Sequence, residues 1–222
     1  MKILSRDSLH RGGFAGLKET RLIVDKKVGG DHSTWDGLGN FIYLADARFL
    51  PHGETHMHPH RELDVITIML EGRLTHEGSL KDGQSMKANQ VQVQRAGGEG
   101  FAHNEINPDD SGNRLLQLWA LPESAGEPAA YKFYQLEQNE LLRIYGGAKS
   151  QTETFDSHTV IEVGNLKRHK TITKQGQYLA YITNGQAMLN GATVTDGDLI
   201  SGVDFELNVL SDTLHLTVIT KH

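Results

Sequence analysis

Short β-rich runs separated by turn residues recur along almost the whole chain, and this pattern constrains the fold more than any other feature. Runs rich in β-branched and other apolar residues occupy 21–24, 41–44, 65–70, 91–93 and 115–121. Turn dipeptides such as Asp82-Gly83, Asn184-Gly185 and Asn190-Gly191 recur at the short intervals typical of β-sandwiches and barrels. We therefore expect an all-β protein with few short helices, of which the best candidate is the stretch 136–142.

The composition fits a soluble globular protein of one large or two small domains, with 222 residues, 37% hydrophobic and 23% charged. The 28 acidic and 22 basic residues give a net charge of −6, which argues against direct contact with nucleic acid. The amino-terminal segment lacks the apolar core of a signal peptide, and no run approaches the roughly 20 apolar residues of a membrane span. We expect a cytoplasmic, monomeric protein without membrane contact.

The chain contains no cysteine, which excludes disulfides, thiolate metal ligands and cysteine nucleophiles. Any metal must therefore be bound by histidine or carboxylate side chains. Phosphate-binding loops and the Gly-x-Ser-x-Gly motif are absent, and the glycine cluster at 97–100 lies between β-rich runs with no helix after it. These features argue against nucleotide binding.

The segment 122–130 carries two of the five prolines and has no apolar periodicity, so it resembles a crossing between two domains. We expect a first domain over residues 1–130, with this linker at its end, and a second over 131–222. The run Val65–Gly72 is echoed by Tyr178–Gly185, which suggests an internal duplication. The segment 170–177 before the second run contains no histidine, so only the first half is expected to bind a metal.

The stretch 52–60 contains four histidines, and a second motif, His103-Asn-Glu105, follows on a later β-rich segment. Residues at i and i+2 of a strand project from the same face, a spacing shared by His58 with His60 and by His103 with Glu105. Two adjacent strands could therefore aim three imidazoles and one carboxylate at one divalent cation.

The other histidines are expected to have lesser roles. His56 is expected at the mouth of the cavity or behind a ligand, where it would fix the ligand's orientation. His52 lies in a turn and should face solvent, whereas His76 could line the pocket or be a half-buried structural residue. The remaining histidines have no spacing that links them to the site: His10, His32, His158, His169, His215 and His222.

Several of these motifs occur together, in the same order, in a known family. His58-Pro-His-Arg61, the run 64–72, Ala96-Gly97 and His103-Asn-Glu105 resemble the His-Pro-His-Arg, Glu-Thr-Val-Thr, Leu-Glu-Gly, Ala-Gly and His-Ser-Glu motifs of the pirin family, in the cupin superfamily. The resemblance is densest over residues 50–122. It implies two cupin-type β-sandwich (double-stranded β-helix, jelly-roll) domains facing each other, the second one degenerate.

The resemblance also implies one non-haem iron in the first domain, bound by His58, His60, His103 and Glu105. Three histidines and one carboxylate leave about two positions open on an octahedral ion. This ligand set suits Fe(II), with Mn, Co, Ni, Cu or Zn as other occupants. Glu105 is the expected catalytic residue, because a weakly bound carboxylate could accept the proton of a substrate hydroxyl.

Two segments depart from the family pattern. The family's Gly-Asp-Val-Gln-Trp-Met strand is here Asn89–Gln94, which lacks the aromatic residue and places Arg95 before Ala96. The family's aromatic-rich amino-terminal stretch is also absent. These departures should leave the ligands in place and reshape the pocket.

Three functions remain open on the sequence. The first is an iron-dependent dioxygenase that acts on flavonol-like or enediol aromatic substrates with dioxygen, as quercetin 2,3-dioxygenase does. The second is a non-enzymatic, metal- or redox-responsive regulator that docks on a partner such as a transcription factor or metabolic enzyme. The third is a sugar-modifying isomerase, which would need basic residues for phosphate, and the ligand strands offer only Arg61 and Arg95.

Overall fold

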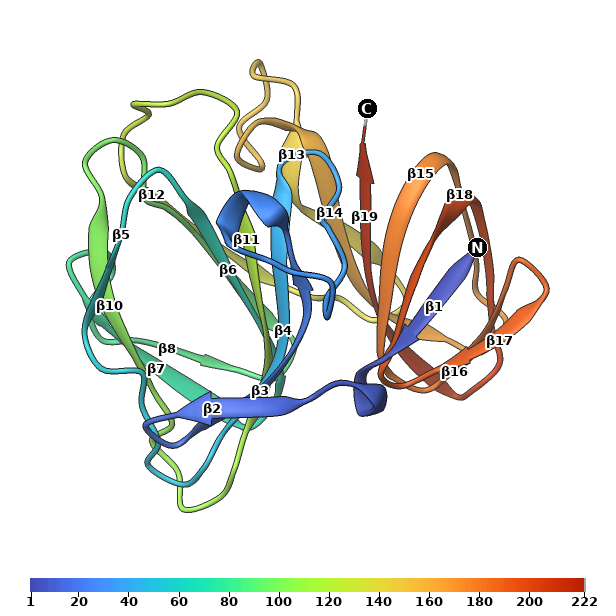
Figure 1. Cartoon of the computed structure of the whole chain (residues 1–222), viewed down its shortest axis with the longest axis horizontal. Helices are drawn as coiled ribbons and strands as arrows, with labels where there is room; N and C mark the ends of the chain where they lie inside the picture. Colours follow the sequence, from blue (N-terminus) through green and yellow to red (C-terminus); the bar gives the residue numbers. More distant parts are fainter. Residues whose placement is uncertain (222) are drawn as a thin grey trace. The chain divides into compact units, whose positions relative to one another are not determined.

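The computed structural model describes residues 1–221 and is almost entirely β-structure, which confirms the predicted fold class (Figure 1). His222, expected to be an ordinary residue, lies outside the described residues. The elements in chain order, with two 3₁₀ helices labelled η, are β1 (Lys2–Ser5), η1 (Arg6–Ser8), β2 (Arg11–Phe14), β3 (Leu17–Val24), η2 (Lys26–Val28), β4 (Phe41–Phe49), β5 (His58–His60), β6 (Asp64–Glu71), β7 (Arg73–Gly78), β8 (Gln84–Lys87), β9 (Gln90–Arg95), β10 (Phe101–Ile106), β11 (Arg114–Ala120), β12 (Ala130–Gln135), β13 (Leu141–Gly147), β14 (Ser157–Lys167), β15 (Thr171–Asn184), β16 (Gln186–Leu189), β17 (Ala192–Thr195), β18 (Asp198–Val209) and β19 (Thr213–Lys221).

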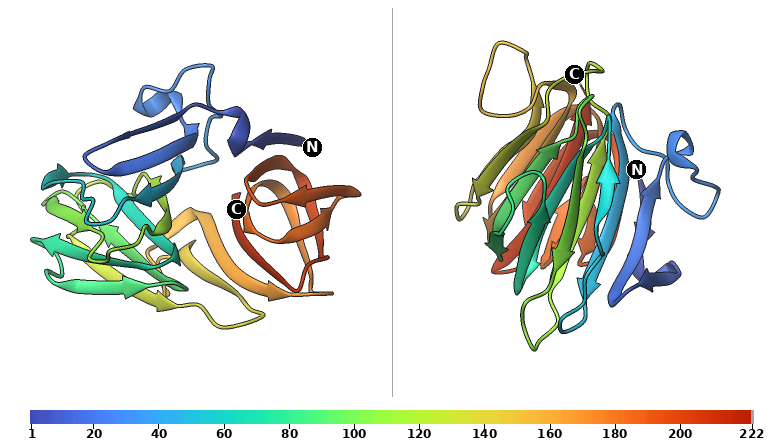
Figure 2. Two further views of the ribbon diagram at one scale, coloured as in Figure 1. Left: turned by 90° about the horizontal axis from the view of Figure 1, so that it is seen from below. Right: turned by 90° about the vertical axis from the view of Figure 1, so that its left-hand side faces the viewer.

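The chain divides into two compact units, Leu9–Gln135 and Met1–Ser8 with Leu136–His222, which we call the amino-terminal and the carboxy-terminal unit. The expected boundary at residues 130/131 differs from this division at two places. Strand β12 pairs with β9 and so belongs with the first unit, while β1 pairs with β18 and joins the second unit (Figures 1 and 2). A strand joins the sheet that satisfies its backbone hydrogen bonds, and sequence composition does not reveal that partner.

The amino-terminal unit contains two sheets. One has the order β5-β10-β7-β8, and the other has the order β12-β9-β6-β11-β4-β3-β2. Strand β6 is buried along nearly all of its length, and side chains of β6 and β9 reach across to β10. The two sheets therefore face each other as a sandwich whose interior can hold a site.

The carboxy-terminal unit contains one eight-stranded sheet with the order β13-β14-β19-β15-β18-β16-β17, and β1 pairs with β18. Its apolar core includes the side chains of Tyr178, Phe205, Leu207 and Leu216.

The predicted short helix at 136–142 is wrong, because this stretch forms a turn that leads into β13. Asn139 adopts a left-handed conformation with φ of 65°. Its backbone N–H donates to the carbonyl of Asn165, and its side-chain oxygen accepts from the N–H of Lys167. Asparagine tolerates this backbone conformation and bonds locally, which favours a turn over a helix.

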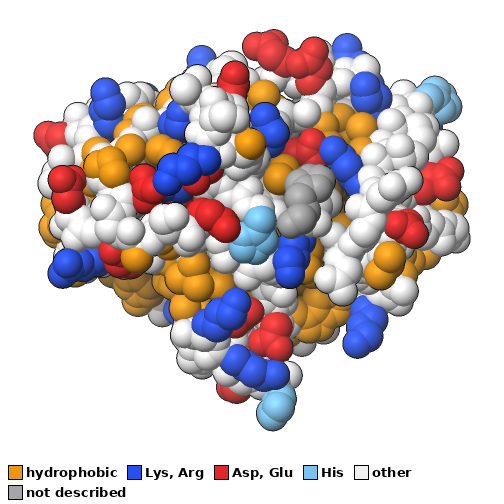
Figure 3. Space-filling model, turned by 90° about the horizontal axis from the view of Figure 1, so that it is seen from above, with side chains coloured by type: hydrophobic (Ala, Val, Ile, Leu, Met, Phe, Trp, Pro, Cys, Tyr) orange, Lys and Arg blue, Asp and Glu red, His pale blue; other side chains and the backbone are white. Residues whose placement is uncertain are grey.

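The surface of the protein carries charges of both signs. On the face shown in Figure 3, Lys and Arg side chains are interspersed with Asp and Glu. Within residues 1–221, no helix has the length and apolar character needed to cross a membrane.

Candidate metal centre and its cavity

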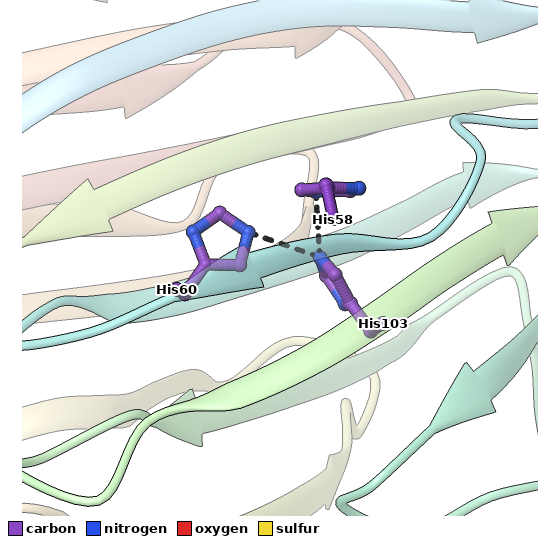
Figure 4. Close-up of side chains that lie close together, drawn as sticks. All are labelled: His58, His60 and His103. Atoms are coloured by element: carbon purple, nitrogen blue, oxygen red, sulfur yellow. Dashed lines mark hydrogen bonds between the residues drawn. The ribbon is translucent and has the colours of Figure 1, made fainter.

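Strands β5 and β10 bring three histidines to one point. The strands pair antiparallel, with His103 opposite His58 and Phe101 opposite His60. His58 and His60 are two residues apart on β5 and share its inner face, which His103 also occupies. The predicted spacing therefore brings His58, His60 and His103 together in the structure (Figure 4).

The three imidazoles meet through their Nε2 atoms. His103 Nε2 lies 3.0 Å from His58 Nε2 and 3.1 Å from His60 Nε2. His58 Nδ1 lies 2.8 Å from the carbonyl oxygen of His56, which can only accept, so His58 Nδ1 carries the hydrogen and its Nε2 presents a lone pair. His103 Nε2 carries at most one hydrogen, and one N–H cannot make two good hydrogen bonds in different directions. Hydrogen bonding therefore cannot satisfy both of its contacts, with His58 Nε2 and with His60 Nε2.

Burial keeps the imidazoles of His60 and His103 neutral. Burial, together with the neighbouring His58, lowers the pKa of His60 to about 4. Burial and the neighbouring His60, His58 and His76 lower the pKa of His103 to about 2. Neutral imidazole nitrogens are the form that binds a metal.

The spacing of the nitrogens fits a transition metal. Nitrogens bound cis to each other at about 2.1 Å from an octahedral ion lie about 3.0 Å apart, and the two observed separations are 3.0 and 3.1 Å. Within residues 1–221, these three histidines are the one group of at least three side chains that could hold a metal. Glu105 is not part of that group.

Glu105 lies two residues after His103 on β10 and is buried. Its Oε1 accepts a hydrogen bond of 2.8 Å from the Thr67 hydroxyl and one of 3.4 Å from Gln92 Nε2. Burial raises the pKa of Glu105 to about 7, although the bonds from Thr67 and Gln92 act in the opposite direction. Oε2 has no hydrogen-bond partner among residues 1–221, and Glu105 lines a cavity beside the histidines.

This cavity, which we call the metal cavity, has a volume of about 300 Å³. The three histidines and Glu105 line one part of it, and the rest is mostly apolar, with Leu17, Phe49 and Leu115 among the lining residues. Tyr43 and Trp119 stack with ring centroids 4.1 Å apart and form an aromatic wall. A small, flat, mainly apolar molecule matches such a space.

The structure places the other predicted histidines outside the cluster. His56 is exposed and orients His58 through its backbone carbonyl. His52 faces solvent in a turn next to Asp110, as predicted. His76 is fully buried, does not line the metal cavity, and packs its ring 5.2 Å from that of His103.

Polar residues of the opposite sheet were missed by the sequence reasoning. Thr67 on β6 and Gln92 on β9 hold Glu105, and Gln94 Nε2 lies 2.9 Å from His76 Nε2. The available signal was the alternation of glutamine at 90, 92 and 94 with valine at 91 and 93.

The position of Arg95 tests the isomerase alternative, which would need a basic side chain to bind phosphate. Its guanidinium is buried and paired with the carboxylate of Asp64, with Nη2 3.2 Å from Oδ2. Arg95 does not line the metal cavity. Of the two arginines that the ligand strands offered for phosphate, Arg95 is therefore committed to a structural ion pair.

Comparisons with known proteins agree with this geometry. Residues 25–120, which contain all three clustered histidines, match the family model Pirin. The chain is pirin-like. The predicted resemblance to the pirin family, within the cupin superfamily, is therefore confirmed.

Two curated relatives are similar to part of the pirin-like chain. It is 38% identical over 86 residues to a putative quercetin 2,3-dioxygenase of Zymomonas mobilis, covering 39% of this chain and 36% of that protein. It is 33% identical over 148 residues to a quercetin 2,3-dioxygenase of Escherichia coli K12, covering 64% of each. Both matches span less than two thirds of the relative's own length.

A solved structure extends the likeness to the whole fold. A bacterial pirin from Escherichia coli, crystallised in complex with nickel(II), superposes with a TM-score of 0.85 at 16% identity, covering 99% of this chain and 98% of that one. At this identity, the match establishes the fold, a bicupin β-sandwich.

Proposed function

We propose that the pirin-like chain is a metal-dependent dioxygenase, with Fe(II) as the working metal, that acts on flavonol-like or enediol aromatic molecules. The observation that carries the proposal is the convergence of three imidazole nitrogens on one point at the wall of a mostly apolar cavity. The names of the curated relatives supply the reaction type, since both contain quercetin 2,3-dioxygenase. The metal centre belongs to the amino-terminal unit, and the carboxy-terminal unit would be the degenerate copy.

The donor set supports a divalent transition metal. Imidazole nitrogens with a nearby carboxylate suit Fe(II), and also Mn, Co, Ni, Cu and Zn, because such sites discriminate poorly among these ions. The Escherichia coli pirin that shares this fold was crystallised with nickel(II). His58, His60 and His103 would hold the ion, and Glu105 would be the fourth ligand when its Oε2 turns toward it. A bound metal would supply Lewis acidity and redox chemistry toward dioxygen.

The protein's own residues would position the substrate and move a proton. The apolar walls and the Tyr43–Trp119 stack would bind a flat ring and exclude water. The Thr67 hydroxyl and Gln92 amide fix Oε1 of Glu105, which leaves Oε2 to take the proton of the substrate's enol hydroxyl. For a flavonol, the overall reaction would consume one dioxygen, open the heterocycle and release carbon monoxide.

Oxygen uptake tests this proposal. The purified protein would be loaded with Fe(II) without air and then given air-saturated buffer with a panel of flavonols and enediols. We expect uptake coupled to carbon monoxide release with at least one flavonol, and none from zinc-loaded protein, because Zn²⁺ has no redox chemistry. Glu105→Gln should slow turnover by about 100-fold or more. The control Glu77→Gln, on an exposed side chain of the same sheet, should match the wild type.

Full iron occupancy without uptake for any compound would refute the dioxygenase. It would favour the regulatory alternative, in which oxidation of the metal changes the affinity for a partner protein while no turnover occurs.

A further inference from the structure

The metal cavity has a polar group in its wall that the proposed reaction does not use. Arg21 and Glu19 project from β3 and line the cavity together with Tyr43 of β4. Arg21 Nε donates to Glu19 Oε1 over 2.8 Å, and the Tyr43 hydroxyl donates to Glu19 Oε2 over 3.1 Å. Each carboxylate oxygen of Glu19 therefore already has a protein partner.

Glu19 is a fixed support for the guanidinium. Its side chain is 7% exposed, whereas that of Arg21 is 55% exposed. Burial and the charge of Glu19 raise the pKa of Tyr43, so the phenol stays protonated and keeps donating. With both oxygens engaged, Glu19 holds Arg21 in one place.

Arg21 retains hydrogen-bond donors for a ligand. A guanidinium carries five N–H donors. Glu19 engages its Nε and Nη2 atoms, and the Tyr43 hydroxyl also interacts with the guanidinium. The remaining N–H groups belong to a side chain that lines both the metal cavity and a second cavity of about 370 Å³. The second cavity is also lined by the polar residues His10, Asp31, Ser33 and Thr34, so a ligand that reaches Arg21 meets polar surroundings there.

Charge decides which part of a ligand this group can recognise. The carboxylate of Glu19 neutralises Arg21, so the pair as a whole carries no net charge. An anionic oxygen would therefore favour the metal end of the cavity, and a neutral hydroxyl or carbonyl would favour the donors of Arg21.

We propose that Arg21 is a specificity-determining residue that donates hydrogen bonds to hydroxyl groups of an aromatic ligand at the end away from its enol. The ligand class is thus a flat polyhydroxylated aromatic compound rather than any apolar enol. This inference rests on the proposed function for the position of the enol.

Two probes that differ only in distal hydroxyls test the inference. Quercetin and 3-hydroxyflavone share the enol and the adjacent carbonyl, but only quercetin carries hydroxyls on the outer rings. Their dissociation constants would be measured by titration calorimetry on Fe(II)-loaded protein without air, for the wild type and Arg21→Gln. Arg48→Gln makes the same change of charge at a residue that lines neither cavity.

We expect Arg21→Gln to weaken quercetin binding by about tenfold or more, as the loss of a charged hydrogen bond predicts, and to change 3-hydroxyflavone binding by less than about twofold. Arg21→Lys should fall between, since it keeps the charge and loses the planar fork. Arg48→Gln should leave both constants unchanged.

Equal weakening of both probes, no change for quercetin, or no binding of either probe to the wild type would each overturn the inference. Unchanged 3-hydroxyflavone binding also shows that the variant is folded. Selective weakening of quercetin in a protein that takes up no oxygen would refute the dioxygenase alone, and oxygen uptake without this selectivity would refute only the role of Arg21.

Discussion

The two units of the chain differ most in what they bury. The amino-terminal unit buries charged side chains: Glu19, Asp25, Asp46, Asp64, Arg95, Glu105 and Arg114. The polar side chains buried in the described part of the carboxy-terminal unit are those of Thr154, Ser157, Thr159, Thr183, His215, Thr217 and Thr220. Burying a charge is expensive unless it is paired, whereas hydroxyl groups can bond to a nearby backbone. Most of these charges are paired, as Asp64 is with Arg95 and Asp46 with Arg114, so the interior of the first unit depends on ion pairs.

The echoed segments show how the site arises. Before β6, the chain breaks at Glu62, which adopts a left-handed conformation with φ of 51°, and the preceding strand β5 joins the other sheet beside β10. In the carboxy-terminal unit, the residues before the echoed run at Tyr178 belong to the long strand β15. This strand remains paired with β18 on both sides of a register shift between Lys174 and Gln177. The break at Glu62 allows the histidines of β5 to face β10.

The largest expected effect concerns the metal and separates the two units. His60→Ala should reduce the bound metal from about one equivalent to less than a tenth, because one of three converging nitrogens is lost. His215→Ala removes the buried histidine of the other unit, whose Nδ1 contacts Thr183, and should leave the metal content unchanged. Both variants would be dialysed against the same metal concentration, and elemental analysis would then measure the metal bound to each.

His56→Ala is the control for the histidine-rich segment, since that side chain is exposed and its carbonyl remains. Metal retained in His60→Ala, or lost equally in His56→Ala, would contradict the assigned centre.

The next largest effect concerns the buried ion pairs. Asp64→Ala removes the carboxylate that pairs with the buried Arg95 and should lower the free energy of unfolding of the amino-terminal unit by about 3–5 kcal/mol. The double variant Asp64→Leu with Arg95→Met should lose much less, because it removes both charges. Both tryptophans, Trp35 and Trp119, lie in this unit, so urea unfolding followed by tryptophan fluorescence reports on it directly. A double variant as unstable as the single one would show that the cost comes from lost packing instead.

The features predicted from the sequence were local. The spacing of His58 and His60 and the order of the β-rich runs depend on neighbours within a few residues, and the structure has those strands and that cluster. The environment of Glu105 depends on Thr67 and Gln92, from strands of the opposite sheet, which spacing does not reveal.

Arg21 shows the same limit. Nothing in its neighbourhood distinguishes it from a surface arginine, and only the packing of β3 against β4 places it at a cavity beside Tyr43. The strand 89–94 contains no aromatic residue, and the aromatic wall of the cavity is the stack of Tyr43 and Trp119, from two other strands. The helix expected at 136–142 failed because a single asparagine turn outweighs a short apolar pattern.

A smaller effect compares the two echoed turns. Gly72 and Gly185 both have left-handed φ values, 74° and 85°. An added methyl at Gly72 would lie 2.9 Å from the Asn113 side chain, whereas at Gly185 it would lie 2.1 Å from the backbone oxygen of Thr213. Gly72→Ala should cost about 1–2 kcal/mol, and Gly185→Ala more, because strand backbone yields less than a side chain. Tryptophan fluorescence would follow the unfolding of Gly72→Ala, and far-ultraviolet circular dichroism would follow that of Gly185→Ala. Equal costs would mean that backbone conformation alone sets the penalty.

The smallest expected effect tests whether charge matters in the carboxy-terminal unit at all. Arg168 and Asp212 form an exposed pair there, with Nη2 3.0 Å from Oδ1 and side chains 51% and 91% exposed. Solvent and salt screen such a pair, so Arg168→Ala should change the free energy of unfolding by less than about 1 kcal/mol. The measurement is urea unfolding followed by circular dichroism at low and high salt. A loss close to that of Asp64→Ala would remove the contrast between the units, because it would show that the second unit also depends on paired charges.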